Sequence, residues 1–158
     1  MPRVVRRRRL PATAQEIWSV VSDPYHLPRW WPRTQRVENV SGGDGKGRRW
    51  TQVLETRDGR GVRADYRCTS AASAERYIFE QQLADSPFER ILKSATTEIR
   101  LDPSGEDTEV TLASDQRLRG IQRFGGGFFL RRATGRTLAA ALEGLDRAVG
   151  GEAAEARD

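Results

Sequence analysis

Residues 124–149 read FGGGFFLRRATGRTLAAALEGLDRAV, and this stretch decides the fold. Leu138, Leu142, Leu145 and Val149 recur at the spacing i, i+4, i+7 and i+11, which places them on one stripe of a helix. At about 1.5 Å per residue the stretch extends roughly 39 Å as a helix, enough to cross a small domain. An apolar stripe on a helix needs a surface to pack against. We therefore expect the preceding chain to form that surface.

The middle of the chain consists of short segments of alternating polarity, separated by clusters of turn-forming residues. Alternation with a period of two is typical of half-buried strands. Six such strands joined by tight turns predict an antiparallel meander that begins near residue 35 and ends near residue 118. The turn clusters stand at residues 41–45, 57–59, 71–73, 85–87 and 102–105.

A first strand at residues 4–10 and two short helices are predicted before this meander. Thr13 and Glu16 form a capping-box pattern at the start of the first helix. Asp23 and Pro24 supply an N-cap residue and a first-turn proline for the second helix, which Pro32 ends. The apolar faces consist of Ala14, Ile17, Trp18 and Val21 in the first helix and Leu27, Trp30 and Trp31 in the second.

Two segments resemble a known family. Residues 10–32, LPATAQEIWSVVSDPYHLPRWWP, resemble the opening of the polyketide cyclase/dehydrase-like branch of the START/Bet v 1-like (SRPBCC) superfamily, and residues 137–149 are similar to its last helix. The resemblance implies an α+β helix-grip fold, a seven-stranded antiparallel sheet curved around a long C-terminal helix with two short helices after strand 1. We expect a single domain over residues 1–149 and a flexible tail over residues 150–158.

The charged residues indicate which face of each strand points away from the helix. In residues 60–70, for example, Arg63, Asp65 and Arg67 share one face, so Tyr66 and its neighbours of the same parity face inward. For the strand near residues 92–101 the sequence does not decide which face points inward, because its two parities are about equally apolar. The predicted inner set outside that strand is Trp50, Gln52, Leu54, Val62, Ala64, Tyr66, Cys68, Tyr77, Phe79, Gln81, Leu83, Val110, Leu112, Ser114 and Gln116.

This inner set is aromatic and aliphatic but contains several uncharged polar side chains. A buried amide without a partner costs about 1–3 kcal/mol, so these groups need a ligand, water, one another or the backbone. One interpretation is a pocket for a small organic molecule; the other is that the polar groups reach solvent at strand ends or bond to the backbone. The candidate ligand-binding residues are Trp50, Gln52, Tyr66, Tyr77, Phe79, Gln81, Ser114, Gln116, Phe124 and Phe128.

The glycine triplet at residues 125–127 has two interpretations. Each glycine costs a helix about 1 kcal/mol relative to alanine, so the triplet either leaves room for a ligand at the cavity mouth, beside Phe128, or forms a loop before a helix that starts near Phe128.

The sequence predicts no cofactor and no metal. One cysteine, Cys68, and one histidine, His26, are too few for the usual zinc sites. The Gly42–Gly45 loop lies between two predicted strands and lacks the following helix of a phosphate-binding loop. No apolar run approaches the roughly 20 residues of a membrane span, and the N-terminus does not resemble a secretory signal. We expect a cytoplasmic protein, either a monomer or a homodimer.

Basic residues are concentrated at the N-terminus. Residues 1–10 contain five arginines and no acidic residue, and this decade alone accounts for the formal net charge of +5. The run is either a solvated strand face or a contact for nucleic acid or an anionic surface.

Three functions follow from these patterns. The first is a carrier that encloses a small hydrophobic, polyketide-like or lipid-like molecule. The second is a polyketide cyclase, aromatase or dehydratase, in which Tyr66 or Tyr77 assists proton transfer. The third is a basic interaction module for nucleic acid or an acidic surface, which uses Arg6–Arg9.

Overall fold

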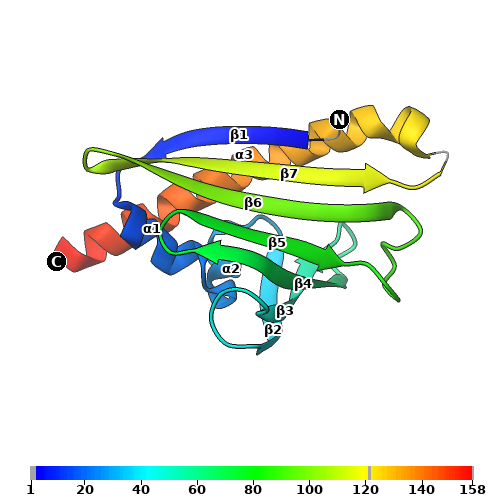
Figure 1. The fold of residues 1–158 in the computed structure, drawn as a ribbon, viewed down its shortest axis with the longest axis horizontal. Helices are drawn as coiled ribbons and strands as arrows, with labels where there is room; N and C mark the ends of the chain where they lie inside the picture. The colour runs from blue at the N-terminus through cyan, green and yellow to red at the C-terminus, as the bar shows by residue number, and fades with distance from the viewer. Residues whose placement is uncertain (1–2, 121, 158) are drawn as a thin grey trace.

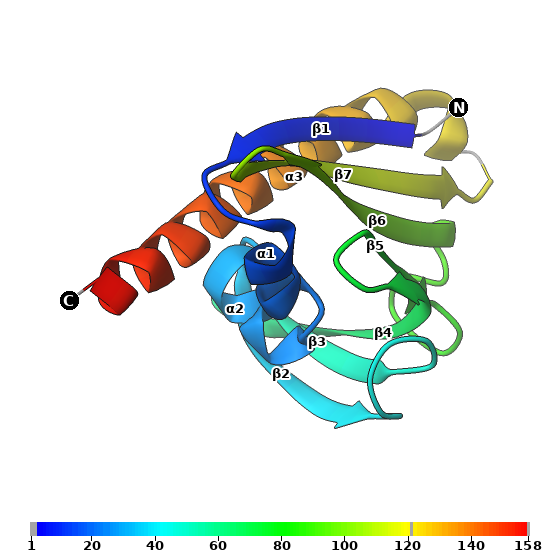
Figure 2. The same cartoon turned by 60° about the vertical axis from the view of Figure 1, so that its left-hand side comes forward.

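A single curved sheet holds the fold together, and a long helix lies across its concave side (Figures 1 and 2). The structure is a computed structural model that describes residues 3–120 and 122–157, with side-chain surroundings for residues 3–120 and 127–150. The predicted helix-grip architecture is confirmed: seven antiparallel strands follow the order β1-β7-β6-β5-β4-β3-β2. They span Arg3–Leu10 (β1), Thr34–Ser41 (β2), Arg49–Glu55 (β3), Gly61–Ala72 (β4), Arg76–Gln82 (β5), Leu92–Ser104 (β6) and Asp107–Leu118 (β7).

The first predicted short helix is present as α1, Ala14–Val21. The hydroxyl of Thr13 accepts a hydrogen bond from the backbone N–H of Glu16 at 3.2 Å, which satisfies one of the free donors of the first turn. Ile17 and Val21 are buried against the rest of the core, so the predicted apolar face of this helix is confirmed.

The second predicted short helix is divided into a 3₁₀ turn, η1 (Pro24–His26), and α2 (Leu27–Trp30). Trp31 lies outside α2 with an extended backbone, so it does not belong to the helical face predicted for it. The reason is local: Pro32 follows, and a residue before proline is pushed out of the helical conformation. The indole of Trp31 therefore projects in a different direction from that of Trp30.

Helix α3 spans Gln122–Arg157 and buries the stripe predicted for it. Leu138, Leu142, Leu145 and Val149 are at most 3% exposed, and burying each side chain contributes about 1.5–3 kcal/mol. The helix includes the glycine triplet, so the loop interpretation of those glycines is wrong. It also continues beyond Val149, and the flexibility predicted for residues 150–158 stays a prediction.

The strand parity inferred from the charged residues is confirmed. Trp50, Ala64, Cys68 and Phe79 are buried, while the arginines of the same strands point outward. A β-bulge resolves the ambiguous strand, because the pairing of β6 with β7 shifts register between Leu92 and Ser94. Such an extra residue exchanges the two faces of a strand, so the inner face changes from even to odd positions. The inner residues of β6 are Leu92, Ala95, Thr97, Ile99 and Leu101.

The contact between α2 and α3 requires a glycine at position 144. A Cβ atom there would lie 2.3 Å from the carbonyl oxygen of Trp30 and 3.0 Å from its Cα, and both are backbone atoms. The two helices can therefore approach this closely only where the side chain is missing. Trp30 is 2% exposed, so its indole is held in the core by the same contact.

Within the described residues, no helix has both the length and the apolar character needed to cross a bilayer.

We predict that Gly144→Ala lowers the free energy of unfolding by about 1–3 kcal/mol, because the added methyl group meets rigid backbone. The control is Gly150→Ala on the same helix, where nothing lies within 4 Å of a new Cβ. That substitution should raise stability by roughly 0.5–1 kcal/mol through helix propensity. Urea unfolding measures both values, and equal stabilisation by the two alanines would contradict the close contact.

Candidate ligand-binding cavity

A cavity of about 370 Å³ lies between the concave face of the sheet and the N-terminal half of α3. Its walls come from β3 to β7, from the β5–β6 connection, from Trp31 after α2 and from one face of α3. The residues from the sheet and its connections are Gln52, Leu54, Tyr66, Phe79, Gln81, Phe88, Ile91, Leu92, Ala95, Thr97, Ser114 and Gln116. Those from α3 are Leu130, Ala133, Thr134, Thr137 and Leu138.

The register of the sheet brings the sheet residues of this wall together. Phe79, Thr97 and Ser114 are consecutive Cα partners across β5, β6 and β7. Tyr66 is the partner of Gln81 across β4 and β5 in the same way. Side chains at directly opposed positions lie about 4.5–5.5 Å apart at Cβ, so residues far apart in sequence form one continuous surface.

Three aromatic rings form one side of the cavity. Trp31 and Phe79 pack edge to face with ring centroids 6.5 Å apart. Tyr66 packs against Phe79 in the same manner at 5.6 Å. Edge-to-face pairs are a favourable arrangement for aromatic rings, so this wall is both rigid and apolar.

Trp50 and Tyr77, which were predicted to line the pocket, lie behind this wall. Trp50 stacks on Tyr66 at 5.8 Å with an interplanar angle of 17°, and Tyr77 stacks on Trp50 at 6.5 Å. Both are only 2% exposed. Tyr77 also contacts Trp18 of α1, and neither Trp50 nor Tyr77 lines the cavity.

The polar side chains of the cavity divide into satisfied and unsatisfied groups. The amide of Gln52 donates to the Thr34 hydroxyl at 2.7 Å, and the Thr134 hydroxyl donates to Gln116 Oε1 at 3.1 Å. The Nε2 atom of Gln81 is buried without a hydrogen-bond partner in the described part of the chain. Among the described residues, the hydrogen bonds of the Gln52 and Gln116 side chains are thus made to other side chains and not to the backbone. The ligand interpretation stays a prediction, and Gln81 is the group that a bound molecule would satisfy.

The cavity wall carries no charged side chain among the described residues. Burial raises the pKa of Tyr66 to about 12, so its hydroxyl stays protonated at neutral pH and can donate a hydrogen bond. Burial also raises the pKa of Cys68, which is 0% exposed and behind the wall, so this thiol is not an activated nucleophile.

Two phenylalanines predicted to bind the ligand, Phe124 and Phe128, are not part of the described wall. Phe124 lies outside the residues whose side chains the structure describes. Phe128 is 69% exposed and faces β1. The reason is helical geometry: Phe128 precedes Leu130, a lining residue, by two positions, and two steps turn a helix by roughly 200°.

Sequence reasoning missed the contribution of α3. Leu130, Ala133, Thr134, Thr137 and Leu138 follow the spacing i, i+3, i+4, i+7 and i+8, which is the same helical signal that identified the buried stripe. Extending that stripe toward the N-terminus would have found them. Small and polar residues concealed the pattern.

No group of three or more histidine, cysteine, aspartate or glutamate side chains that could hold a metal is present among the described residues.

Known structures share this architecture. A START superfamily protein from Mycobacterium smegmatis superimposes with a TM-score of 0.77 at 18% identity, covering 94% of this chain and 97% of the other. The Zhui aromatase/cyclase from a Streptomyces strain gives 0.71 at 20% identity, covering 99% and 95%. TTHA0849 from Thermus thermophilus gives 0.75 at 21% identity, covering 96% and 99%. At these identities the likeness concerns the fold alone.

Sequence comparison supplies the family. A search of curated protein sequences gives no match to the chain. The family model described as "Polyketide cyclase / dehydrase and lipid transport" matches residues 1–150, which is nearly the whole chain. The protein therefore belongs to the polyketide cyclase/dehydrase and lipid transport family.

Proposed function

We propose that this protein is a carrier that encloses one small, uncharged, largely apolar molecule in the cavity beneath α3. The observation that supports this function is the composition of the wall: four aromatic rings, aliphatic side chains, an unpartnered Gln81 amide and no charged group among the described residues. Most ligand pockets share this make-up, with apolar walls and a few directed hydrogen bonds.

The chemistry of the wall limits the ligand. A charged group in this cavity would lose its hydration without meeting an opposite charge, which is very unfavourable. Gln81 and Tyr66 both offer N–H or O–H donors, so the ligand should carry carbonyl or hydroxyl oxygens. At about 370 Å³ the cavity is near the lower end of the range for ligand sites. A compact polyketide-like or lipid-like molecule meets these requirements.

A cyclase is the second candidate, and one observation favours it. The neutral hydroxyl of Tyr66 and the amide of Gln81 belong to directly opposed residues, so both could donate to one carbonyl oxygen and stabilise the negative charge that develops there. The cavity wall offers no carboxylate or imidazole as a general base among the described residues. This is why we favour the carrier.

We predict that Ala95→Phe weakens the binding of the uncharged fluorescent probe N-phenylnaphthylamine by roughly tenfold or more, because the phenyl ring occupies the cavity. The matched control is Thr96→Phe, which adds a similar bulk to the opposite face of the same strand and should leave the affinity unchanged. A fluorescence titration measures both. Equal binding by the two variants would contradict the proposed site.

We predict that Tyr66→Phe weakens binding of a probe that carries a carbonyl group by about three- to tenfold, the effect of one lost hydrogen bond. If the protein is a carrier, weaker binding is the whole effect, and neither the unaltered protein nor the variant forms a product. If the protein cyclises an aromatic polyketide precursor, the same substitution lowers turnover far more than affinity. Product analysis by chromatography beside the binding titration decides between the two functions.

We predict that the free energy of unfolding falls as the pH rises from about 10 to about 12. The pKa of Tyr66 is near 10 in the unfolded chain and about 12 in the folded protein. The contribution of protonated Tyr66 to the free energy of unfolding is therefore fully present below pH 10. It is lost as the pH rises through the pKa of Tyr66 in the folded protein, by about 2–3 kcal/mol in total.

Tyr66→Phe should flatten this decline, whereas a residual slope remains from buried Tyr77, whose pKa is also raised by burial. Urea unfolding at a series of pH values measures the effect. An unchanged slope in the variant would show that Tyr66 ionises freely in the folded protein.

A further inference from the structure

A second hollow lies on the outside of the molecule, where the start of β1 meets the N-terminal part of α3. This cleft of about 770 Å³ is lined by Arg3, Arg6, Arg131, Arg132 and Phe128, together with the backbone neighbours Val4 and Val5. No acidic residue lines it among those described. Figure 1 shows the two elements side by side at the end that holds the N-terminus.

The arginines of this cleft are largely free of acidic partners. Among the described residues, Arg6, Arg131 and Arg132 form no ion pair, and Arg6 donates only to the carbonyl of Val5 at 2.8 Å. Arg3 reaches Glu98 at 3.8 Å and remains half exposed. The cleft therefore carries an excess of positive charge that the protein itself does not neutralise.

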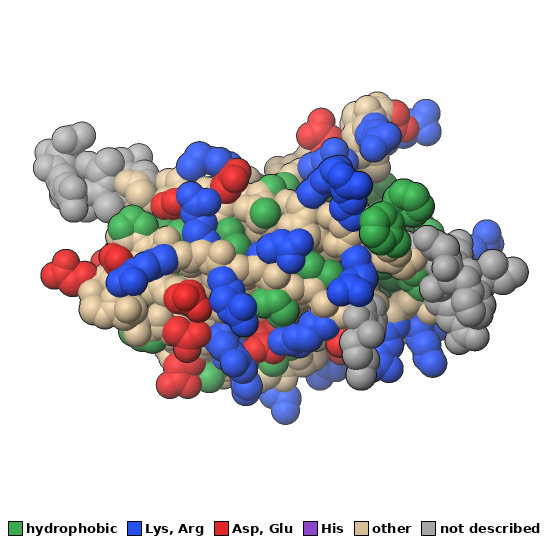
Figure 3. Space-filling model, turned by 90° about the horizontal axis from the view of Figure 1, so that it is seen from above, with side chains coloured by type: hydrophobic (Ala, Val, Ile, Leu, Met, Phe, Trp, Pro, Cys, Tyr) green, Lys and Arg blue, Asp and Glu red, His purple; other side chains and the backbone are tan. Residues whose placement is uncertain are grey.

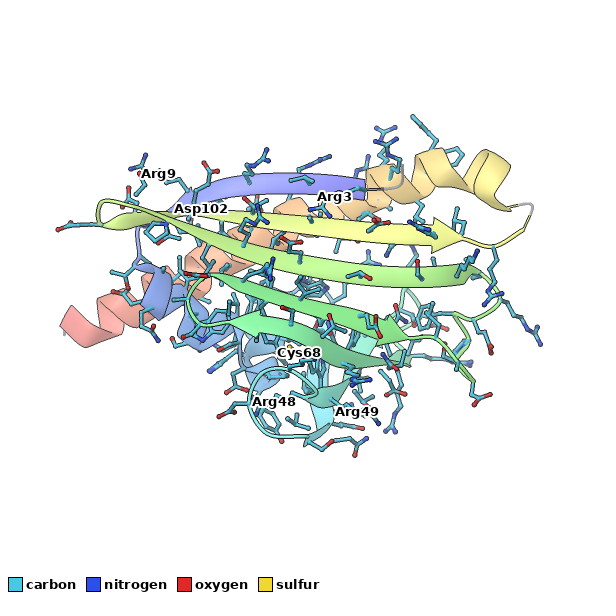
Figure 4. All side chains as sticks on the ribbon, viewed as in Figure 1. Arg3, Arg9, Arg48, Arg49, Cys68 and Asp102 are labelled. Carbon is cyan, nitrogen blue, oxygen red and sulfur yellow. The ribbon has the colours of Figure 1, made fainter. Side chains whose placement is uncertain are left out.

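Arg7, Arg8 and Arg9 of β1 each lie near an acidic residue, and the interaction module predicted for Arg6–Arg9 stays a prediction. Arg8 contacts Asp146 at 2.8 Å and Arg9 contacts Asp107 at 3.0 Å. Arg7 lies 4.0 Å from Glu109. Arg3 and Arg9 lie at opposite ends of the strand (Figure 4), so the unpaired positive charge of β1 lies toward the N-terminal part of α3.

Two exposed phenylalanines accompany these arginines. Phe128 is 69% exposed and Phe129 is 72% exposed, and their rings pack edge to face at 5.7 Å. They are two of only four large hydrophobic residues that the described part of the chain exposes. Hydrophobic side chains gather among basic ones at this end of the molecule (Figure 3), and such a patch on a soluble protein marks an interaction site.

From this arrangement we infer that the cleft and the phenylalanine pair form a docking surface for an anionic phospholipid bilayer. The guanidinium groups of Arg6, Arg131 and Arg132 would bind lipid phosphates through charge-assisted hydrogen bonds. The rings of Phe128 and Phe129 would enter the boundary between headgroups and acyl chains.

The charges also argue against other occupants. A second copy of the chain placed on the same surface would bring two sets of arginines together, and like charges repel. A nucleic acid would meet the arginines but would leave the packed phenylalanine pair without an apolar environment. A bilayer offers negative charge and an apolar layer within a few ångströms of each other, which matches both parts of the surface.

The docking surface adjoins the ligand cavity. Phe128, Arg131 and Arg132 lie on one side of α3, while Leu130, Ala133 and Thr134 of the same turns line the cavity. A docked protein would therefore hold this part of the cavity wall close to the membrane. That consequence rests on the proposed carrier function, whereas the docking itself does not.

The test is sedimentation of the full chain with vesicles, either of phosphatidylcholine alone or of phosphatidylcholine with phosphatidylserine. We expect binding only to the anionic vesicles, and we expect it to weaken as salt is added. Arg131→Gln combined with Arg132→Gln should lower the partition constant roughly 10- to 30-fold. Phe128→Ala combined with Phe129→Ala should lower it at least about tenfold.

Two control variants keep the experiment specific. Arg60→Gln combined with Arg147→Gln removes the same two charges away from the cleft, and Tyr25→Ala removes an aromatic side chain that is 59% exposed elsewhere. Both should bind like the unaltered protein, and all variants should keep its melting temperature and its affinity for N-phenylnaphthylamine.

Absent vesicle binding, equal binding to neutral vesicles, or equal losses in test and control variants would overturn the proposal. Preferential binding to single-stranded RNA would overturn it as well. Loss of the probe site without loss of vesicle binding would count against the carrier function alone.

Discussion

The close contact between Gly144 and the backbone of Trp30 fixes the depth at which α3 lies in the curved sheet. Around this contact the leucines of α3 fill the concave side completely. Toward the N-terminus the same face carries Ala133, Thr134 and Thr137 between Leu130 and Leu138, and among these described residues only Thr134 forms a hydrogen bond to the sheet, at 3.1 Å to Gln116. The cavity thus lies beside the segment of α3 where short side chains replace the leucines.

The two faces of the sheet also differ in charge. The inner rows are uncharged, and several arginines of the outer rows lie close to acidic residues of other strands, as Arg9 does to Asp107 and Arg63 to Glu38. Exposed pairs of this kind add little stability. Where β1 meets the N-terminal part of α3, Arg6, Arg131 and Arg132 form no ion pair among the described residues, so one short segment of helix combines a neutral cavity wall with an unpaired basic cleft.

The sequence was informative where a feature depends on local periodicity. Charged residues alone identified the inner face of β3, β4, β5 and β7, and the leucine stripe identified the buried face of α3. The β6 parity was not predictable, because a bulge near Lys93 exchanges its faces through pairing with β7. Ion pairs such as Arg8–Asp146 were not predictable either, because they join residues that are distant in sequence. Trp50 and Tyr77 have the right parity, but only the packing of the neighbouring rings shows that they are covered.

Native mass spectrometry of the protein purified from its own host, without extraction of small molecules, shows whether the cavity is occupied. We expect a complex heavier than the 17.8 kDa chain by one small, uncharged molecule that is released on denaturation. The same preparation of Ala95→Phe should show the bare chain. A bare chain for the unaltered protein, with no uptake of apolar probes, would contradict the account.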